Sequence, residues 1–144
     1  MEVKIVNHTQ HPLPSYATAG ASGLDLRAYL TAPIVMRPLQ RALIGTGIHI
    51  ALPPGTEAQV RSRSGLALKH GITVLNSPGT IDSDYRGEIH ALLINLSDQP
   101  FTVHDGERIA QLIVSQYVSI RWVPVQVLDA TTRGTRGYGS TGVT

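Results

Sequence analysis

Hydrophobic residues occur along this chain in short runs, separated by glycine, proline, asparagine or aspartate. The clearest runs cover residues 3–6, 44–51, 58–61, 91–96 and 108–114. Short apolar runs between turn residues are typical of the strands in an all-β sandwich or barrel. No segment keeps the 3.6-residue spacing of a helix over three turns, so the pattern predicts no long helix.

One short helix and a last strand complete the predicted elements. Ser64 is expected to cap a helix over residues 65–70, because a serine hydroxyl accepts hydrogen bonds from N-terminal backbone amides. Gly71 suits the left-handed end of that helix. Residues 122–128 alternate valine with other side chains, which predicts a final strand with its three valines on one face. We expect Trp122 to pack in the core or in a contact between subunits.

Composition and charge narrow the class of protein. The 144 residues suffice for one domain with a single buried core. The chain has no cysteine, which excludes disulfides and thiolate metal sites and fits a reducing compartment. No apolar run is long enough to span a membrane, and the N-terminus lacks the layout of a signal peptide. The net charge of +2 is small, so it suits an acidic small molecule as well as a polyanion. We therefore expect a cytoplasmic protein.

The composition changes near Asp129. Residues 131–144 hold four glycines and two arginines, with almost nothing that can be buried. Such a segment does not offset its own ordering entropy. We therefore expect a β domain over residues 1–130 and a mobile Gly-rich C-terminal arm over residues 131–144. A frayed terminus is the alternative.

The most unusual loop precedes the apolar run that begins near residue 89. Residues 79–88 read Gly-Thr-Ile-Asp-Ser-Asp-Tyr-Arg-Gly-Glu, whereas a loop that only reverses the chain needs few residues, mainly Gly, Asn or Asp. If the segment is extended, Asp82 and Asp84 share one face and Tyr85 points to the other. That arrangement sets a carboxylate near a water and a ring against a flat or sugar-like ligand. A solvated hairpin tip is the alternative.

Two further segments carry groups that suit an anion. Arg61 and Arg63 lie two residues apart and precede a Ser-Gly helix start, which is a ready phosphate site. In the arm, Arg133 and Arg136 add fork-shaped donors, and the glycines leave backbone amides open to an anion. Because most caps and most chain ends bind nothing, an ordinary cap and a frayed end stay open as alternatives.

Polar residues also interrupt two apolar strands. Asp25 lies in a predicted strand whose leucines face the other way. Gln111 interrupts an apolar run and must find a partner or a ligand. His8 and His11 are close in sequence, but no carboxylate accompanies them, so they do not indicate a metal site.

Together, five blocks of the chain resemble the five ordered motifs of the trimeric dUTP diphosphatase (dUTPase) family. The blocks lie around Asp25, Arg63, Asp82, Gln111 and Arg133, and they span nearly the whole chain in the family's order. The resemblance implies a β jelly roll and a homotrimer whose active sites are shared between subunits. It also implies hydrolysis of dUTP to dUMP and pyrophosphate with Mg²⁺, which limits uracil incorporation into DNA and supplies dUMP for thymidylate synthesis.

The resemblance also implies a role for each matching residue. Asp82 would be the general base that deprotonates the attacking water. Asp25 would meet the waters of a Mg²⁺ ion that the substrate phosphates mainly hold. The residues that would bind phosphate are Arg63, Ser64, Gly65, Gln111, Arg133, Ser140 and Thr141. Those that would bind the uracil and the deoxyribose are Asn76, Gly79, Thr80, Ile81, Tyr85 and Tyr138.

Three positions depart from the family's usual pattern. Ser62 stands where many members have proline, which is expected to loosen the strand without removing a ligand group. Tyr138 stands where phenylalanine is commonest, so stacking on the base is kept. Arg136 stands where glycine is usual, and we expect it to face solvent.

Two other functions stay open. A dCTP deaminase-like relative would share the fold, and a non-catalytic nucleotide-binding module would keep the fold without the reaction. The full set of motifs favours dUTPase over the deaminase, and the water-activating Asp82 argues against a binding module. Binding of single-stranded nucleic acid has little support, because aromatic residues make up 5% of the chain and no basic stripe is present. We therefore expect neither nucleic acid nor a membrane as a partner.

Overall fold

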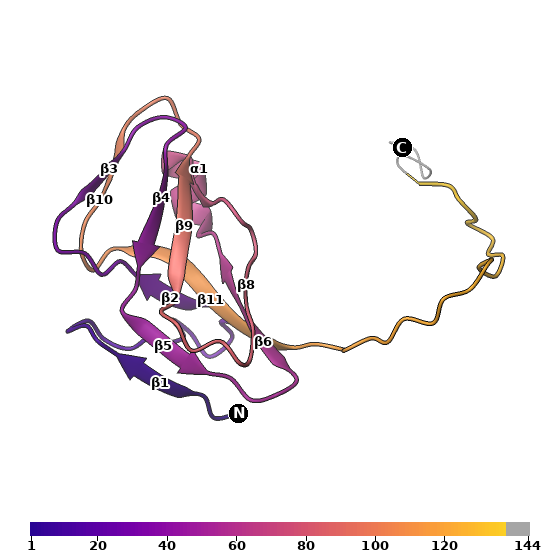
Figure 1. Ribbon diagram of the computed structural model, residues 1–144. Coiled ribbons are helices and arrows are strands. Elements are labelled where there is room, and N and C mark those ends of the chain that lie inside the picture. The colour runs from indigo at the N-terminus through magenta and orange to yellow at the C-terminus, as the bar shows by residue number, and fades with distance from the viewer. Residues whose placement is uncertain (138–144) are drawn as a thin grey trace.

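The structure is a computed structural model and describes residues 1–137 of the chain. Within that range it has eleven strands and one short helix (Figure 1). The elements are β1 (Lys4–Asn7), β2 (Leu24–Arg27), β3 (Ile34–Met36), β4 (Arg41–Gly45), β5 (Ile48–Ala51), β6 (Thr56–Arg61), α1 (Ser64–His70), β7 (Ile72–Val74), β8 (Gly79–Ile81), β9 (His90–Asn95), β10 (Phe101–Val103) and β11 (Arg108–Gln116). The mostly β fold predicted from the sequence is confirmed.

The strands form four hydrogen-bonded sheets in which every pairing is antiparallel. The largest sheet has the order β2-β11-β6-β8, and a second sheet has the order β4-β9-β7. Two smaller sheets pair β1 with β5 and β3 with β10. The pairing of the described strands does not close into a ring. The fold is therefore a sandwich rather than a closed barrel.

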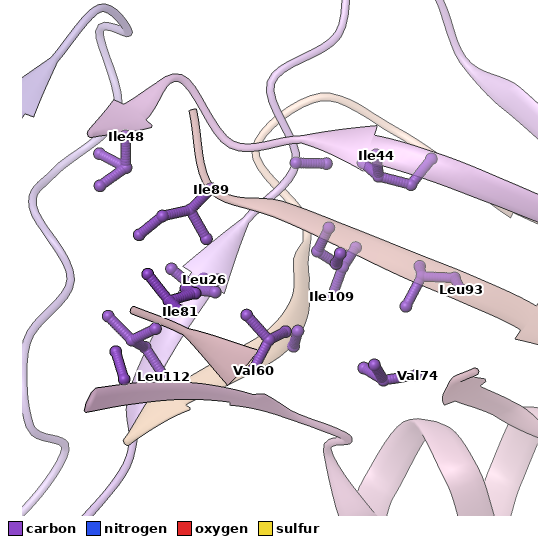
Figure 2. Packing of buried hydrophobic residues seen from close by; sticks show 14 of the residues in the cluster. Leu26, Ile44, Ile48, Val60, Val74, Ile81, Ile89, Leu93, Ile109 and Leu112 are labelled. Carbon is purple, nitrogen blue, oxygen red and sulfur yellow. The ribbon is translucent and has the colours of Figure 1, made fainter. Parts of the chain in front are cut away.

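The core lies between the sheets and consists of alternate residues of the strands. In β9, Ala91, Leu93 and Asn95 are buried, while the residues between them are partly exposed. Burying a leucine or isoleucine side chain stabilises a fold by about 1.5–3 kcal/mol, so this alternation holds the sheets together. Figure 2 shows side chains that meet there from six strands, namely Leu26, Ile44, Val60, Ile81, Leu93 and Leu112.

The apolar run at residues 44–51 forms two strands rather than one. β4 ends at Gly45 and β5 begins at Ile48, and Gly47 between them has a φ of 65°. Side chains with a Cβ rarely adopt this left-handed conformation, so Gly47 marks the turn. The buried hydroxyl of Thr46 donates to the backbone oxygen of Ile89 at 2.7 Å. The turn is therefore fixed to the chain that enters β9.

The predicted helix is confirmed, but its start differs. Gly71 ends α1 in the left-handed conformation, with a φ of 64°. The expected cap by Ser64 is wrong, because Arg63 occupies the N-cap position and Ser64 is the first helical residue. Arg63 is extended, and no side chain caps the helix. The helix has only seven residues, and no helix within residues 1–137 is long and apolar enough to cross a membrane.

The predicted last strand at residues 122–128 is wrong. After β11 the chain leaves the sandwich, and residues 117–137, which we call the C-terminal segment, run away from it (Figure 1). Trp122 is 82% exposed, so it does not pack in the core of this chain. The valines that alternate after it are exposed as well. A strand needs a neighbour for its backbone groups. Apart from the amide of Tyr117, which donates to the Gly55 oxygen at 3.2 Å, the segment makes no backbone hydrogen bond to the rest of residues 1–137.

Candidate active site

A pocket of about 350 Å³ lies at the connection between β8 and β9. The two strands belong to different sheets and do not pair with each other, so the hairpin expected here is a crossover between sheets. We call this connection the hairpin and its cavity the hairpin pocket. Its volume falls in the range of about 300–1,000 Å³ that small-molecule sites occupy. Six residues predicted to act on the nucleotide line it, namely Asn76, Gly79, Thr80, Ile81, Asp82 and Tyr85. The structure therefore brings the predicted base, sugar and water-activating residues into one cavity.

One wall of the pocket is the edge strand β8, which the sequence reading took as part of a loop. β8 pairs with β6 through Gln59 opposite Thr80, and within the described chain it has no strand on its other side. Its outer backbone groups are therefore left without a strand partner. A Cβ on Gly79 would lie 3.1 Å from the side-chain nitrogen of Asn76, so glycine lets the two segments approach closely. The pocket thus presents main-chain donors and acceptors to a flat ligand.

Asp82 and Tyr85 lie in a turn rather than in an extended segment. The backbone amide of Tyr85 donates to the oxygen of Asp82 at 3.1 Å, so the expected alternation of faces is wrong. Arg86 Nη1 donates to the backbone oxygens of Ser83 and Tyr85, both at 2.7 Å, which tightens the turn. Asp82 itself is exposed at the pocket. Its carboxylate is therefore open to water and to a ligand.

Asp25 and Gln111 lie on other strands of the sheet that contains β8, and Arg63 follows β6 in that sheet. Asp25 of β2 lies opposite Gln111 of β11, and Gln111 lies opposite Arg61 of β6. Residues directly opposite one another in antiparallel strands project from the same face. The three strands therefore carry a row of polar side chains, although the apolar residues beside them are buried.

Two arginines hold the carboxylate of Asp25. Arg63 Nε donates to Asp25 Oδ1 at 2.9 Å, and Arg108 Nη1 donates to Oδ2 at 3.1 Å. Arg63 Nη1 also donates to the backbone oxygen of Arg108 at 2.9 Å, which ties the two arginines together. We call Asp25, Arg63 and Arg108 the arginine cluster. Ser64 and Gly65 follow Arg63 directly and are exposed at the start of α1.

The sequence reading missed Arg108. A signal was present, because a charged residue that opens a long apolar run seldom lies in the core. Gln111 has the partner that its position required, since its Nε2 donates to the backbone oxygen of Ser62 at 2.8 Å. A Cβ on Gly23 would lie 2.3 Å from Gln111 Oε1, which is too close, so the glycine leaves room for the side-chain amide. Gln111 is therefore held beside the arginine cluster.

Ser62 does not loosen its strand. Its hydroxyl lies 2.6 Å from the hydroxyl of Thr73 and accepts the backbone amide of Val74 at 2.9 Å. These bonds join the end of β6 to β7 and satisfy a backbone donor, which proline in place of Ser62 would leave unpaired. The serine is thus a second way to fix the chain before Arg63.

Only part of the predicted arm is described. Arg133 is exposed, and its Nε donates to the backbone oxygen of Arg136 at 3.1 Å. Arg136 is exposed as well and bonds back to the oxygens of Arg133 and Thr132. The structure does not bring Arg133 to the arginine cluster or to the hairpin pocket of its own chain. Tyr138, Ser140 and Thr141 lie outside the described residues.

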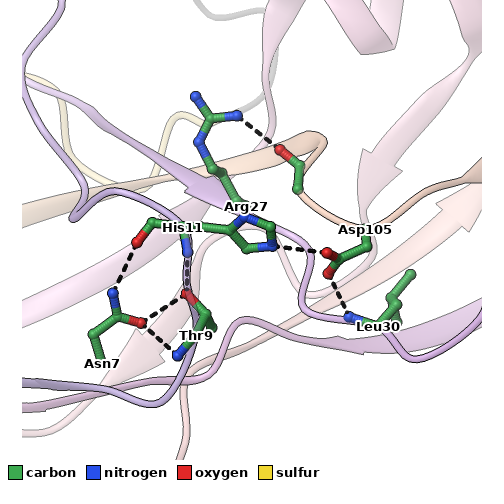
Figure 3. Close-up of polar contacts among 7 residues, drawn as sticks. Asn7, Thr9, His11, Arg27, Leu30 and Asp105 are labelled. Carbon is green, nitrogen blue, oxygen red and sulfur yellow. Dashed lines mark hydrogen bonds and ion pairs between the residues drawn. The ribbon is translucent and has the colours of Figure 1, made fainter.

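His11 has a carboxylate partner after all, from a distant part of the sequence. Its Nε2 lies 3.0 Å from Oδ2 of Asp105, and Oδ1 of Asp105 accepts the backbone amide of Leu30 at 2.8 Å (Figure 3). The amide of Leu30, followed by His11, lowers the pKa of the Asp105 carboxyl below its ordinary value. The contact joins the loop after β1 to the turn between β10 and β11.

Asp25 fits the role of a carboxylate that meets metal-bound waters. Each of its oxygens accepts one arginine bond, and a carboxylate oxygen has room for a second donor. The side chain is 29% exposed, so water reaches it. Mg²⁺ keeps several waters and prefers oxygen ligands from one or two carboxylates together with substrate phosphates. One carboxylate among arginines suits that arrangement and not an all-protein metal cage.

The fold and the two groups of residues define a β-sandwich protein with a pocket of small-molecule size and a separate arginine cluster. The chain belongs to the dUTPase family, because the family's model matches residues 9–142. It is 58% identical to the deoxyuridine 5′-triphosphate nucleotidohydrolase of Cytophaga hutchinsonii over 97% of this chain and 91% of the relative. It is 53% identical to the protein of that name from Finegoldia magna over 99% of both chains.

Solved structures share the fold. The dUTPase of Staphylococcus bacteriophage 80alpha with dUpNHpp superposes with a TM-score of 0.88 at 22% identity, over 99% of both chains. The dUTPase of phage phi11 of S. aureus, a structure concerned with a structural Mg(II) ion, gives 0.80 at 16% identity, over 90% of this chain and 100% of the other. The predicted jelly-roll fold is therefore confirmed.

Proposed function

We propose that this chain hydrolyses dUTP to dUMP and pyrophosphate. The observation that carries the proposal is the match of the dUTPase family over nearly the whole chain. The hairpin pocket supports it, because Asp82 lines the same cavity as the residues proposed to bind the base and the sugar. The relatives cited above are named for this reaction.

In the proposed reaction Asp82 holds a water in line with the α-phosphorus and takes one of its protons. The water oxygen bonds to the α-phosphorus, and the bond from that phosphorus to the oxygen bridging to the β-phosphorus breaks. Pyrophosphate leaves with the bonding electrons. Because an ionised carboxylate is a weak base, positioning and electrostatic stabilisation must supply most of the rate. Arg63, Gln111 and the start of α1 would stabilise the phosphate charge.

The hairpin pocket accounts for the choice of substrate. The free edge of β8 would read the donors and acceptors of uracil, since a buried polar site rejects a base whose pattern leaves its groups unpaired. The narrow pocket would exclude the methyl group of thymine. The ring of Tyr85 would pack on the deoxyribose and leave no room for a 2′-hydroxyl. Tyr138 of the arm would cover the base, and Ser140 and Thr141 would meet the phosphates.

Mg²⁺ belongs to the proposal as the partner of the triphosphate. Asp25 would bind it through water, while the substrate phosphates supply the direct ligands. When bound, the ion offsets the charge that accumulates on the phosphates. Arg63 bonds to Asp25 in the free chain, so phosphate oxygens would take the place of the carboxylate as its acceptor.

A homotrimer with shared active sites completes the proposal. The residues that line the hairpin pocket do not include Asp25, Arg63 or Gln111, so one chain carries the base pocket and the phosphate residues apart. The apolar side chains of the C-terminal segment are exposed, which favours cover by another subunit. In a shared site the pocket of one chain would meet the arginine cluster of another, and the arm of a third would close over both. The expected cytoplasmic location is part of the proposal, and cell fractionation tests it.

The first experiment measures pyrophosphate release by the purified chain with Mg²⁺ from dUTP, dCTP, dTTP and UTP. Strong selectivity for dUTP is the expected result, and it tests base, 5-methyl and sugar discrimination together. Ammonia release from dCTP would favour the deaminase instead. Binding of dUTP by the folded protein without pyrophosphate release would favour a non-catalytic module.

A further inference from the structure

Glu88, at the end of the hairpin, bonds both to Tyr85 and to a turn far away in sequence, and no role has been assigned to it so far. Its Oε1 accepts the backbone amide of Gly47 at 2.7 Å, which ties the hairpin to the turn between β4 and β5. Its backbone oxygen accepts the Tyr85 hydroxyl at 3.0 Å. The side chain is 31% exposed and lines the hairpin pocket. One residue therefore joins Tyr85 to the framework of the fold.

His90 fixes the other side of the same residue. Its Nδ1 lies 3.0 Å from the Glu88 backbone oxygen, and because a carbonyl only accepts, Nδ1 carries the hydrogen. Its Nε2 lies 3.7 Å from Glu88 Oε2. That separation is too long for a hydrogen bond, so Glu88 is held through Oε1 and through its backbone oxygen.

Two glycines leave the space that this arrangement needs. A Cβ on Gly45 would lie 2.6 Å from Glu88 Oε1, although the backbone there does not require glycine. A Cβ on Gly87 would lie 2.2 Å from the Tyr85 hydroxyl oxygen, so the ring lies directly over that backbone. The contacts on both sides of Glu88 are therefore close-packed.

We propose that Glu88 is a positioning residue of the nucleotide pocket. It fixes the Tyr85 ring because its carboxylate accepts the backbone amide of Gly47 and so holds the end of the hairpin against the turn between β4 and β5. The inference rests on the proposed function, because it assigns Tyr85 the contact with the sugar. A side chain that contacts the sugar discriminates against a 2′-hydroxyl only while its ring cannot move aside. The Gly47 bond goes to the carboxylate and the Tyr85 bond to the backbone oxygen of the same residue. Loss of the carboxylate therefore frees the hairpin end from the Gly47 turn, and the ring becomes mobile because its acceptor is no longer fixed in place.

The test compares kcat/KM for dUTP and for UTP in the wild type and in five variants of the full chain. In Glu88→Ala we expect the ratio to fall about 10- to 100-fold, the range in which a small misplacement of a positioning group acts. Glu88→Gln keeps an oxygen that accepts the Gly47 amide, so it should keep most of the ratio. Gly45→Ala displaces the carboxylate from the other side and should lower the ratio as well.

The double variant of Gly45→Ala with Glu88→Ala should match Glu88→Ala alone, because residues that act through one contact are not additive. The matched control is Glu107→Ala. Glu107 Oε2 also accepts a backbone amide, that of His104 at 3.0 Å, but its turn does not line the hairpin pocket. Its loss should leave the dUTP-to-UTP ratio unchanged.

A second readout does not depend on turnover. Hydrogen exchange at the Gly47 amide, followed by NMR, should be faster in Glu88→Ala than in the wild type and Glu107→Ala. Faster exchange with an unchanged ratio would make Glu88 structural only and overturn the inference, while the proposed function would stand. Absence of dUTP turnover in the wild type would overturn the proposed function and this inference with it.

Discussion

The hairpin and the C-terminal segment both carry predicted site residues, but only the hairpin is built by its own chain. Ile81 and Ile89, at its two ends, are 7% and 1% exposed, and hydrogen bonds from the turn between β4 and β5 hold Glu88 and Ile89. Every residue of the C-terminal segment is exposed. The hairpin therefore forms its part of the proposed site within one chain, whereas the described chain buries none of the segment's residues.

The composition of the segment explains what a partner must offer. Unlike a polar linker, it carries large apolar side chains, namely Tyr117, Val118, Ile120, Trp122, Val123, Val125, Val127 and Leu128. A group of exposed apolar side chains of this kind favours a contact with a partner. The alternation of valines predicted a strand, and that prediction identifies a segment fit for pairing with another chain.

Replacing Asp82 with asparagine removes the proposed general base from the hairpin, and it has the largest expected effect. Asp82→Asn keeps the shape of the side chain but cannot take the proton of the attacking water. We expect a loss of about 10²–10⁴-fold in kcat, the usual contribution of a positioned base. Pyrophosphate release measures the rate, and calorimetry measures dUTP binding, which should stay near that of the wild type. Turnover near the wild-type rate would remove Asp82 from the role of base.

Truncation after Asp129 tests what the C-terminal arm contributes. It removes the predicted arm with Arg133 but keeps the apolar residues up to Leu128. We expect the oligomer to persist and turnover to fall steeply, because closure of an arm completes such a site and excludes water. Light scattering measures the assembly, and pyrophosphate release measures the rate. If the truncated chain is monomeric, the arm is structural rather than a lid.

Two matched substitutions sharpen the contrast in burial. Leu93→Ala in β9 removes a side chain that is 0% exposed and should lower the free energy of unfolding by about 2–5 kcal/mol. Leu128→Ala removes one that is 80% exposed in the single chain. If another subunit covers it, its loss should weaken the assembly in a way that depends on protein concentration.

Denaturation at several protein concentrations measures both variants. A loss in Leu128→Ala that does not change with concentration, or no loss at all, would contradict cover by another subunit. Leu93→Ala serves as the internal reference, because its side chain is buried within one chain.

The sequence predicted the parts of the molecule that depend on local pattern. Short apolar runs, the single helix and the end of that helix at Gly71 each follow from residues close in the chain. The strand break at Gly47 was missed because residues 44–51 were taken as one run, although Gly45, Thr46 and Gly47 interrupt its apolar residues and glycines are a turn signal. The strand at residues 122–128 and a buried Trp122 were both predicted from the apolar residues of this segment. Periodicity reports a face that needs cover, but not which chain covers it.

The site was predictable by residue type and less so by geometry. Asp25, Arg63 and Gln111 meet because β2, β6 and β11 are neighbours in one sheet, which no local spacing reveals. Arg108 and Glu88 were missed for a related reason, since their partners Asp25 and Gly47 lie far away in sequence. Long-range pairing also explains the error about His11, whose carboxylate partner lies on the β10–β11 turn.

The pair of His11 and Asp105 supplies the smallest predicted effect. It shows how much an electrostatic contact contributes to stability where burial is slight. The pKa of Asp105 is lowered in the folded chain by the Leu30 amide and then by His11. A lowered pKa means that the folded state favours the ionised carboxylate. The resulting stabilisation is complete above the unfolded-state pKa of about 3.9. It is lost as the pH falls through the folded-state pKa.

Asp105→Asn keeps an oxygen for the Leu30 amide but removes the charge. The variant should therefore be slightly less stable than the wild type at neutral pH, and the two should converge as the pH falls below about 4. Because the Asp105 side chain is 45% exposed, solvent screens the pair and the difference is small. Urea denaturation between neutral and acid pH measures it. A stability difference that grows on acidification would contradict the assignment, because it would mean that folding favours the protonated carboxyl.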